Sequence, residues 1–392
     1  MKAISEITVL LRNGKSVRQS ADAGSLPITR IETIADGTIN PAKVGFADLW
    51  ESDCTDWLLK DGDILISHIN STKHLGKCAI YEGDPPALVH GMNLLALRVD
   101  QDAAASRYVY RMLTSPGFRR QLPRITKDSV NQSSFNISNF KKLQIPLPPL
   151  AEQKRIAGIL DAADALRAKR RESLAQLDIL IQSVFLDMFG DPVTNPMGWE
   201  VKGLGLLAEF INGDRGKGYP AKTDFVDDGI PFINAGHLRE GKVDFADMNY
   251  ISQESYDRLR GGKTVSGDIL YCLRGSLGKT AIVRYAGDAA IASSLVIIRP
   301  YDGSCVEYLF AYLVSPFGQK EIRRFDNGSS QPNLSATSVK KYTVQLPPLD
   351  IQHRFAAIVE SVEQQKALQR THLAELDTLF ASLQSRAFRG DL

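Results

Sequence analysis

The sequence predicts an α+β protein with two tandem mixed α/β domains, each followed by a long helix. Three observations carry this prediction. A repeat covers the whole chain, short β-branched apolar runs lie between turn residues, and two Pro-Pro pairs precede helical patterns. The 392 residues are enough for two or three domains.

The repeat is clearest around the Pro-Pro pairs. Residues 147–160 read LPPLAEQKRIAGIL and residues 346–359 read LPPLDIQHRFAAIV, with eight of fourteen positions identical at a separation of 199 residues. Further copies match upstream, such as DGDILIS from residue 61 and SGDILYC from residue 266. The chain is therefore a tandem duplication of a unit of about 200 residues.

Each globular part is predicted to contain both strands and helices. DILIS, CAIY and LLALRV in the first copy, and DILYCL, TAIVRY and SLVIIRP in the second, are apolar runs of strand length. Aromatic and aliphatic spacing predicts one short helix in each copy, stopped by Pro116 or Pro316.

Each Pro-Pro pair is predicted to end a strand and begin a long helix, because proline in the first helical turn costs no backbone hydrogen bond. Apolar residues then follow a 3-4 spacing, typical of a coiled-coil seam, with polar residues in the middle. The predicted seam has nine positions in each helix, at a constant offset of 199: Ile156, Ile159, Ala163, Leu166, Arg170, Ser173, Leu177, Leu180 and Val184, and Phe355, Ile358, Val362, Gln365, Gln369, His372, Leu376, Leu379 and Leu383.

Two such helices, each about 58 Å long, are expected to form a spacer between the domains, with an internal pseudo-twofold axis. The seam pattern fits parallel and antiparallel pairs equally, and it also allows each helix to pack on its own domain alone. The predicted domains are residues 1–149 and 191–348, and the helices are residues 150–190 and 349–392. Two separated heads suit the reading of two half-sites on one duplex.

Composition narrows the class of protein. The chain is 43% hydrophobic and 23% charged, as is ordinary for soluble proteins. We expect a cytoplasmic protein without membrane contact, because no apolar run is long enough to span a bilayer and no secretion signal begins the chain. Four scattered cysteines and six scattered histidines predict reduced thiols and no metal site.

The net charge of +2 does not by itself indicate a nucleic-acid-binding protein. The first 150 residues carry 18 basic and 15 acidic residues, and residues 190–349 carry 18 of each. A DNA-binding surface must therefore be a local patch.

The whole chain resembles the specificity (S) subunit of type I restriction–modification systems. The resemblance rests on LPPLAEQKRIAGIL and its copy, the helix after each, the GSLGK turn at 275–279, the SSFNIS and SSQPNLS stretches, and the terminal AFRGDL. It implies two target recognition domains on an antiparallel coiled coil, and a subunit without catalytic activity. It also implies double-stranded DNA with a bipartite target, two short specific segments separated by a gap that the helices set.

The resemblance further implies partner proteins. Two adenine methyltransferase (modification) subunits and the restriction (nuclease-translocase) subunits are expected to bind this chain. No cofactor is expected in the chain itself, since S-adenosylmethionine and ATP with Mg²⁺ belong to those partners.

Enzymatic motifs in the sequence are incomplete. GKT at 278–280 lacks the glycine of a phosphate-binding loop, because Leu273 stands six residues before the lysine. DPPA at 84–87 resembles a methyltransferase catalytic loop, but Ala87 cannot stack on a flipped base. Methyl transfer is therefore expected from a partner.

Candidate DNA contacts are polar loop residues of types that read base edges or bind phosphate. They fall into two groups in each repeat: Asn70, Ser71, Thr72, Lys73, His74 and Lys77, with Arg124, Lys127, Asn131, Gln132 and Ser133; then Arg274, Ser276 and Lys279, with Arg323, Arg324, Asn327, Ser329, Ser330 and Gln331. Taken singly, each is better explained as part of an ordinary solvated loop, whereas the occurrence of both groups at matching places in both repeats favours DNA contact by the groups together. The alternative function is a two-headed coiled-coil scaffold that binds protein and not DNA, which the near-neutral charge favours.

Overall fold

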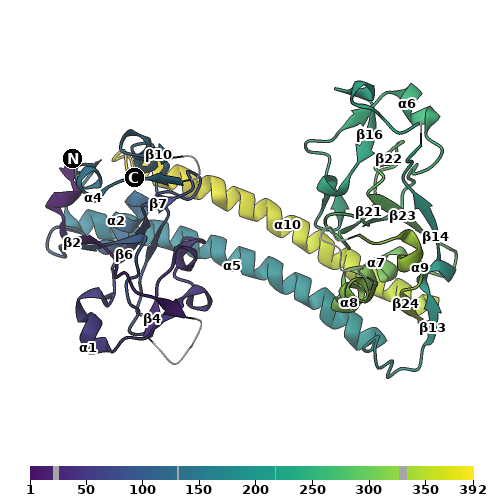
Figure 1. The fold of residues 1–392 in the computed structure, drawn as a ribbon, viewed down its shortest axis with the longest axis horizontal. Helices are drawn as coiled ribbons and strands as arrows, with labels where there is room; N and C mark the ends of the chain where they lie inside the picture. Colours follow the sequence, from purple (N-terminus) through teal and green to yellow (C-terminus); the bar gives the residue numbers. More distant parts are fainter. Residues whose placement is uncertain (21–25, 130–131, 217, 326–332) are drawn as a thin grey trace. The chain divides into compact units, whose positions relative to one another are not determined.

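The structure is a computed structural model that describes residues 1–20, 26–129, 132–216, 218–325 and 333–392. The chain divides into two compact units: unit 1, Met1–Arg171 with Thr371–Leu392, and unit 2, Glu172–Arg370. Both chain termini lie in unit 1 (Figure 1). The expected mixture of strands and helices is confirmed in each unit.

Unit 1 is built around a four-stranded antiparallel sheet. Its order is β2 (Thr8–Asn13), β9 (Leu94–Val99), β6 (Ile64–Ser67) and β8 (Cys78–Ile80). The smaller sheets are formed by β3 (Gln19–Ser20), β5 (Gly45–Ala47) and β4 (Leu26–Ile28); by β10 (Lys127–Ser129), β11 (Gln132–Ser134) and β7 (Ile69–Asn70); and by β1 (Lys2–Ala3) with β12 (Gln144–Ile145). The short helices are α1 (Glu51–Cys54), α2 (Ser106–Leu113), α3 (Pro116–Arg119) and α4 (Ile137–Phe140).

Unit 2 repeats this plan with a larger sheet. Its order is β14 (Ala208–Asn212), β23 (Leu295–Pro300), β20 (Ile269–Cys272), β21 (Thr280–Ile282), β18 (Lys242–Val243) and β17 (Leu238–Arg239). A second sheet contains β15 (Phe225–Val226), β19 (Tyr250–Ile251), β16 (Ile230–Ile233) and β22 (Ala290–Ile291), and β13 (Glu200–Gly203) pairs with β24 (Thr343–Leu346). The shorter helices are α6 (Gln253–Arg258), α7 (Val306–Val314), α8 (Pro316–Phe325) and α9 (Ala336–Lys340).

The two long helices are α5 (Leu150–Phe189) and α10 (Leu349–Ala387), and each contributes one part to each unit. In unit 1 the start of α5 lies beside α2 (Figure 1), and Leu160 of α5 belongs to one buried cluster with the main sheet and Tyr108 of α2. In unit 2 Phe355 of α10 packs among Tyr308 of α7 and Phe189 of α5. Each domain core is therefore completed by helix residues that lie outside the globular part.

A buried glutamine in each helix explains part of the repeated PPL-x-x-Q pattern. In unit 1 the side chain of Gln153 accepts a hydrogen bond from the N–H of Ala105 at 3.0 Å and donates to the carbonyl of Pro148 at 2.8 Å. Gln352 repeats both bonds in unit 2, at 2.9 and 2.8 Å. The glutamine thus fixes the first turn of its helix to the domain.

The helix pair is antiparallel within each unit. In unit 1 Arg155 donates to the carbonyl of Leu392 at 2.7 Å, and further along α5 Arg167 Nε lies 2.6 Å from Asp377 Oδ1. Residue numbers rise along α5 as they fall along α10. In unit 2 Lys366 Nζ lies 2.7 Å from Asp178 Oδ1, and this ion pair is the exact 199-residue counterpart of the one at Arg167. The direction that the pattern left open is thereby fixed.

The buried seam differs from the nine positions predicted in each helix. Leu166 is 54% exposed, and Leu180, Ile358 and Leu379 are also exposed, whereas Leu160 is completely buried. A straight helix has 3.6 residues per turn, so a strict heptad drifts away from the contact face. The inward position after Ala163 is consequently Arg167 rather than Leu166, and its charge is matched by carboxylates.

Candidate nucleic-acid interface

In unit 1 the structure brings the two predicted groups of DNA contacts together. Strand β11 pairs with β10 on one side and with β7 on the other, and Ser133 lies opposite Asn70. The turn after β7 therefore lies beside the strands that carry the second group. Lys127 and Gln132 are exposed on these strands, and Lys73 is exposed in the turn.

Hydrogen bonds inside this sheet use some of the predicted side chains. Thr72 Oγ1 lies 2.8 Å from Ser133 Oγ, and the Ser133 hydroxyl donates to Asp128 Oδ1 at 2.5 Å. Ser133 is only 2% exposed, so its hydroxyl orders the turn, and base contact by Ser133 would need the turn to open. Asn70 donates to the Ser67 hydroxyl at 3.2 Å.

Three further predicted residues of unit 1 lie in the segments next to these strands. Ser71 and Arg124 are exposed, and His74 is half-buried. The backbone N–H of Ser71 donates to Asn70 Oδ1 at 2.8 Å. Asn131 lies outside the described residues.

Both turns close at a glycine with a left-handed backbone. Gly76 has φ +72°, and a Cβ there would lie 2.2 Å from Leu122 Cδ1. Gly278 has the same φ, and a Cβ would lie 2.2 Å from Ile322 Cδ1. The left-handed backbone favours glycine, and any Cβ would have to displace the end of Leu122 or Ile322, which explains the glycine of the shared Gly-Lys pair.

The lysine after each glycine makes an equivalent internal contact. Lys77 Nζ donates to the carbonyl of Ala35 at 2.6 Å, and Lys279 Nζ donates to the carbonyl of Ala235 at 2.8 Å. This repeated bond gives the lysine shared by the two repeats a structural role. Phosphate contact by these two amines stays a prediction. Each amine uses one N–H in the bond to the carbonyl, so its other N–H groups would have to bind the phosphate.

In unit 2 the structure joins Arg274 to the start of α9. Arg274 forms an isolated bridge with Asn333, and its Nε donates to Asn333 Oδ1 at 3.3 Å. Ser276 is exposed in the same turn. Arg323 and Arg324 lie in the last turn of α8, where Arg324 pairs with Glu321 at 3.6 Å. Asn327, Ser329, Ser330 and Gln331 lie outside the described residues.

A hollow of about 540 Å³ beside Arg274 contains residues that the sequence analysis missed. Asn212, Arg215 and Arg260 line it together with Arg274 and Asn333. Arg215 follows strand β14 directly after a turn, and Arg260 follows α6. In the sequence, Arg215 and Arg260 are marked only as basic residues in loops. Their proximity to Arg274 depends on the tertiary fold.

Two buried histidines lie behind the interface of unit 1. Burial lowers the pKa of His68, which directly precedes β7, to about 4, and lowers the pKa of His90 to about 4. The Nδ1 atoms of both rings are buried and have no hydrogen-bond partner among the described residues. His90 Nε2 lies 2.9 Å from the carbonyl of Leu94, as a neutral ring that donates from Nε2 would. Both rings are therefore neutral structural groups.

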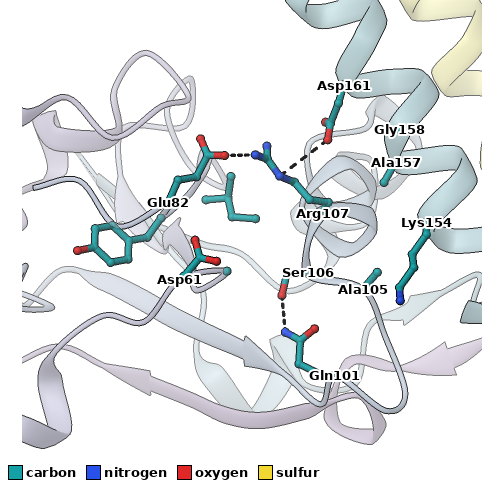
Figure 2. Close-up of a pocket in the computed structure, with 13 residues that line it drawn as sticks. Asp61, Glu82, Gln101, Ala105, Ser106, Arg107, Lys154, Ala157, Gly158 and Asp161 are labelled. Carbon is teal, nitrogen blue, oxygen red and sulfur yellow. Dashed lines mark hydrogen bonds and ion pairs between the residues drawn. The ribbon is translucent and has the colours of Figure 1, made fainter. Parts of the chain in front are cut away.

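A second hollow, of about 880 Å³, lies against the first turns of α5 in unit 1 (Figure 2). Arg107 bridges Glu82 and Asp161 across it, as the dashed lines in Figure 2 show. In unit 2 the corresponding pair is Arg284 with Glu307, so the charges are exchanged. Three carboxylates, of Asp61, Glu82 and Asp161, and two cations, of Arg107 and Lys154, line this hollow, and Arg107 is already paired, so the lining offers little attraction to a DNA backbone.

Comparison with known proteins identifies the family. A model described as the type I restriction modification DNA specificity domain matches residues 1–176 and 196–378. The chain belongs to this family.

Relatives match along most of their length. The chain is 29% identical to a Methanocaldococcus jannaschii protein assigned as the specificity subunit of the type I restriction enzyme MjaX, over 96% of this chain and 89% of that protein. It is 27% identical to the EcoBI type I restriction enzyme specificity subunit of Escherichia coli, over 78% and 70%. The solved S subunit of the M. genitalium type I system has a TM-score of 0.60 at 16% identity, over 99% and 95%. This last likeness supports the fold.

Within the part of the chain that the structure describes, none of the helices combines the length and the apolarity needed to cross a bilayer.

Proposed function

We propose that this chain is the DNA specificity subunit of a type I restriction–modification complex and reads a bipartite target on double-stranded DNA. The observation that carries the proposal is a turn closed by Gly-Lys in each unit, which pairs with a second polar segment through β7 and β11 in unit 1 and through the bridge between Arg274 and Asn333 in unit 2. The polar side chains on this frame differ, with half-buried Asn70 and exposed Gln132 in unit 1 and exposed Arg274 in unit 2. Different side chains on one frame are what two different half-sites require.

Catalysis belongs to partner subunits in this proposal. Two methyltransferase subunits would supply S-adenosylmethionine chemistry, and restriction subunits would supply ATP- and Mg²⁺-dependent cleavage, in the cytoplasm. Exposed apolar side chains on α5 support protein partners: Ile179, Leu180 and Leu186 in unit 2 are all large and solvent-facing. Such side chains, gathered on one helix, mark interaction surfaces.

Selection of bound sequences tests the proposal. The full chain with its methyltransferase partner is mixed with randomised duplexes, and the bound fraction is sequenced after several rounds. We expect two short conserved segments separated by a fixed gap. The methyltransferase without this chain is the control and should enrich no such motif. Absence of enrichment with the complete mixture would overturn the proposal and favour the protein-binding scaffold.

A further inference from the structure

The hollow beside Arg274 collects arginines from three separate parts of unit 2. Arg215 comes from the loop after β14, Arg260 from the loop after α6, and Arg274 from the turn after β20. Asn212 and Asn333 add amide groups to the lining. All three guanidinium-bearing residues are exposed. The fold thus places three guanidinium groups, each planar with five N–H donors, around one hollow of about 540 Å³.

These arginines differ from most others of the unit in their pairing. Six arginines of unit 2 form ion pairs with carboxylates: Arg239, Arg258, Arg284, Arg299, Arg324 and Arg370. Among the described residues, no carboxylate lies within ion-pair distance of Arg215, Arg260 or Arg274. Three like charges around one hollow repel one another, although water screens this repulsion at exposed positions, so an electron-rich ligand placed among them is favoured.

One carboxylate does line the hollow, but backbone groups occupy it. Asp214 accepts hydrogen bonds from the N–H of Gly216 at 2.8 Å and the N–H of Arg260 at 3.1 Å. Those bonds lower the pKa of Asp214 and keep it ionised. Its role is to hold the two loops together, which sets the positions of Arg215 and Arg260.

Two of the guanidinium groups are oriented by neutral partners. Arg274 Nε donates to Asn333 Oδ1 at 3.3 Å, and Arg215 Nη2 donates to the carbonyl of Ser293 at 3.1 Å. The paired Nη groups of Arg274 stay available as a fork. A fork of two N–H donors matches the O6 and N7 acceptors of guanine in the major groove.

We propose that this hollow reads guanine in the second half-site, with Arg274, Arg215 and Arg260 as specificity-determining residues. The inference rests on the proposed function and deepens it. In unit 1 the position that corresponds to Arg274 is Ile69, which pairs with Ser134 as Arg274 pairs with Asn333 and carries no hydrogen-bonding side chain. The two half-sites are therefore predicted to differ in composition, and the half-site read by unit 2 contains at least one G·C pair.

Lysine substitution separates guanine reading from simple phosphate contact. Arg274→Lys and Arg260→Lys keep the positive charge but remove the planar fork. Bound-sequence selection is performed with the full chain and its methyltransferase, alongside Arg239→Lys as the control. Arg239 lies in the same unit and is paired with Asp244 at 2.9 Å. Thermal unfolding of each variant confirms that the fold is retained.

We expect each hollow variant to lose about 5- to 150-fold of its preference for guanine at one position, with the other half-site unchanged. The salt dependence of binding should stay the same, because the charge is kept. A wild-type motif without guanine in either half-site would overturn the inference while leaving the proposed function intact. So would Arg274→Ala and Arg260→Ala variants that weaken all sequences equally and reduce the salt slope by about one, the signature of phosphate contact. If the wild type enriches no bipartite motif, the proposed function itself fails.

Discussion

Asp63 and Arg98 form a two-pronged ion pair in unit 1, with Nε–Oδ1 and Nη2–Oδ2 distances of 2.7 and 2.6 Å. Asp268 and Arg299 repeat it in unit 2 at 2.8 and 2.9 Å. Both carboxylates are buried, with side-chain exposures of 1% and 0%. The pair joins the start of β6 to the end of β9 in unit 1, and the start of β20 to the end of β23 in unit 2. Both copies of the repeat therefore retain it.

Loss of this buried carboxylate should be costly. Asp63→Ala leaves the Arg98 guanidinium without its partner and removes the acceptor of the Lys60 N–H. We expect the free energy of unfolding to fall by about 3 kcal/mol, measured by urea denaturation. Asp36→Ala is the control, since Asp36 pairs with Lys43 in an exposed position, and its effect should be much smaller. Equal losses in the two variants would contradict a special role for the buried pair.

The lysines of the two Gly-Lys turns can be tested for a structural role and for DNA contact. Lys77→Met removes the bond to the Ala35 carbonyl, so we expect unfolding to become easier by about 1 kcal/mol. If Lys77 also binds phosphate, the same variant lowers affinity for all sequences and reduces the salt slope by about one. Lys279→Met should behave in the same way in unit 2. An unchanged slope in both variants would restrict these lysines to a structural role.

Stability should depend on pH through the buried histidines. The pKa of His90 is about 4 in the folded chain, below its usual value of 6.5, because burial disfavours the charged ring. Between these values the unfolded chain binds the proton and the folded chain does not, so stability falls as the pH drops from about 6.5 to 4. The expected slope is about 1.4 kcal/mol per pH unit for each such histidine.

His90→Gln removes one titrating group while keeping an N–H donor for the Leu94 carbonyl. Urea unfolding of both proteins at pH 7 and pH 5 measures the difference. The variant should lose less stability than the wild type on acidification. Parallel losses would show that other groups control the acid sensitivity.

Exchange of residues 1–146 for the same domain of another family member should alter one half-site only. The core of unit 1 also includes Ile156, Ala157 and Leu160 of α5, so the donor domain must fit these retained side chains. Selection of bound sequences gives the result. Two altered half-sites would contradict independent reading by the two units.

Shortening the helices should change the gap in the DNA target and leave its bases unchanged. Removal of one heptad near residues 165–175 of α5, with the matching heptad of α10, shortens the spacer by about 10 Å, or roughly three base pairs. Removal of matching heptads keeps the remaining residues of α5 opposite their partners on α10, so the other contacts between the two helices are retained. A constant gap in the selected sequences would contradict the spacer role.

Much of the architecture could be read from repetition. The 199-residue offset predicted two similar mixed domains, and the Pro-Pro pairs predicted helices that begin at Leu150 and Leu349, as observed. Proline residues and β-branched runs act on the backbone locally, so the helix starts and strands that they favour can be predicted from the sequence. The family resemblance, confirmed by the matched residues, supplied the antiparallel direction that the periodic pattern left open.

The sequence by itself determined the duplication, the helix starts and the polar turns, because each depends on neighbouring residues along the chain. Tertiary structure alone decided the rest. It placed Arg167 rather than Leu166 at the contact between the helices, because a straight helix drifts away from the heptad spacing and Asp377 pairs with the Arg167 charge. It buried Ser133 in a hydrogen-bonded turn and gathered Arg215, Arg260 and Arg274 around one hollow. Those residues lie up to 59 positions apart, and only the packing of strands and loops brings them together.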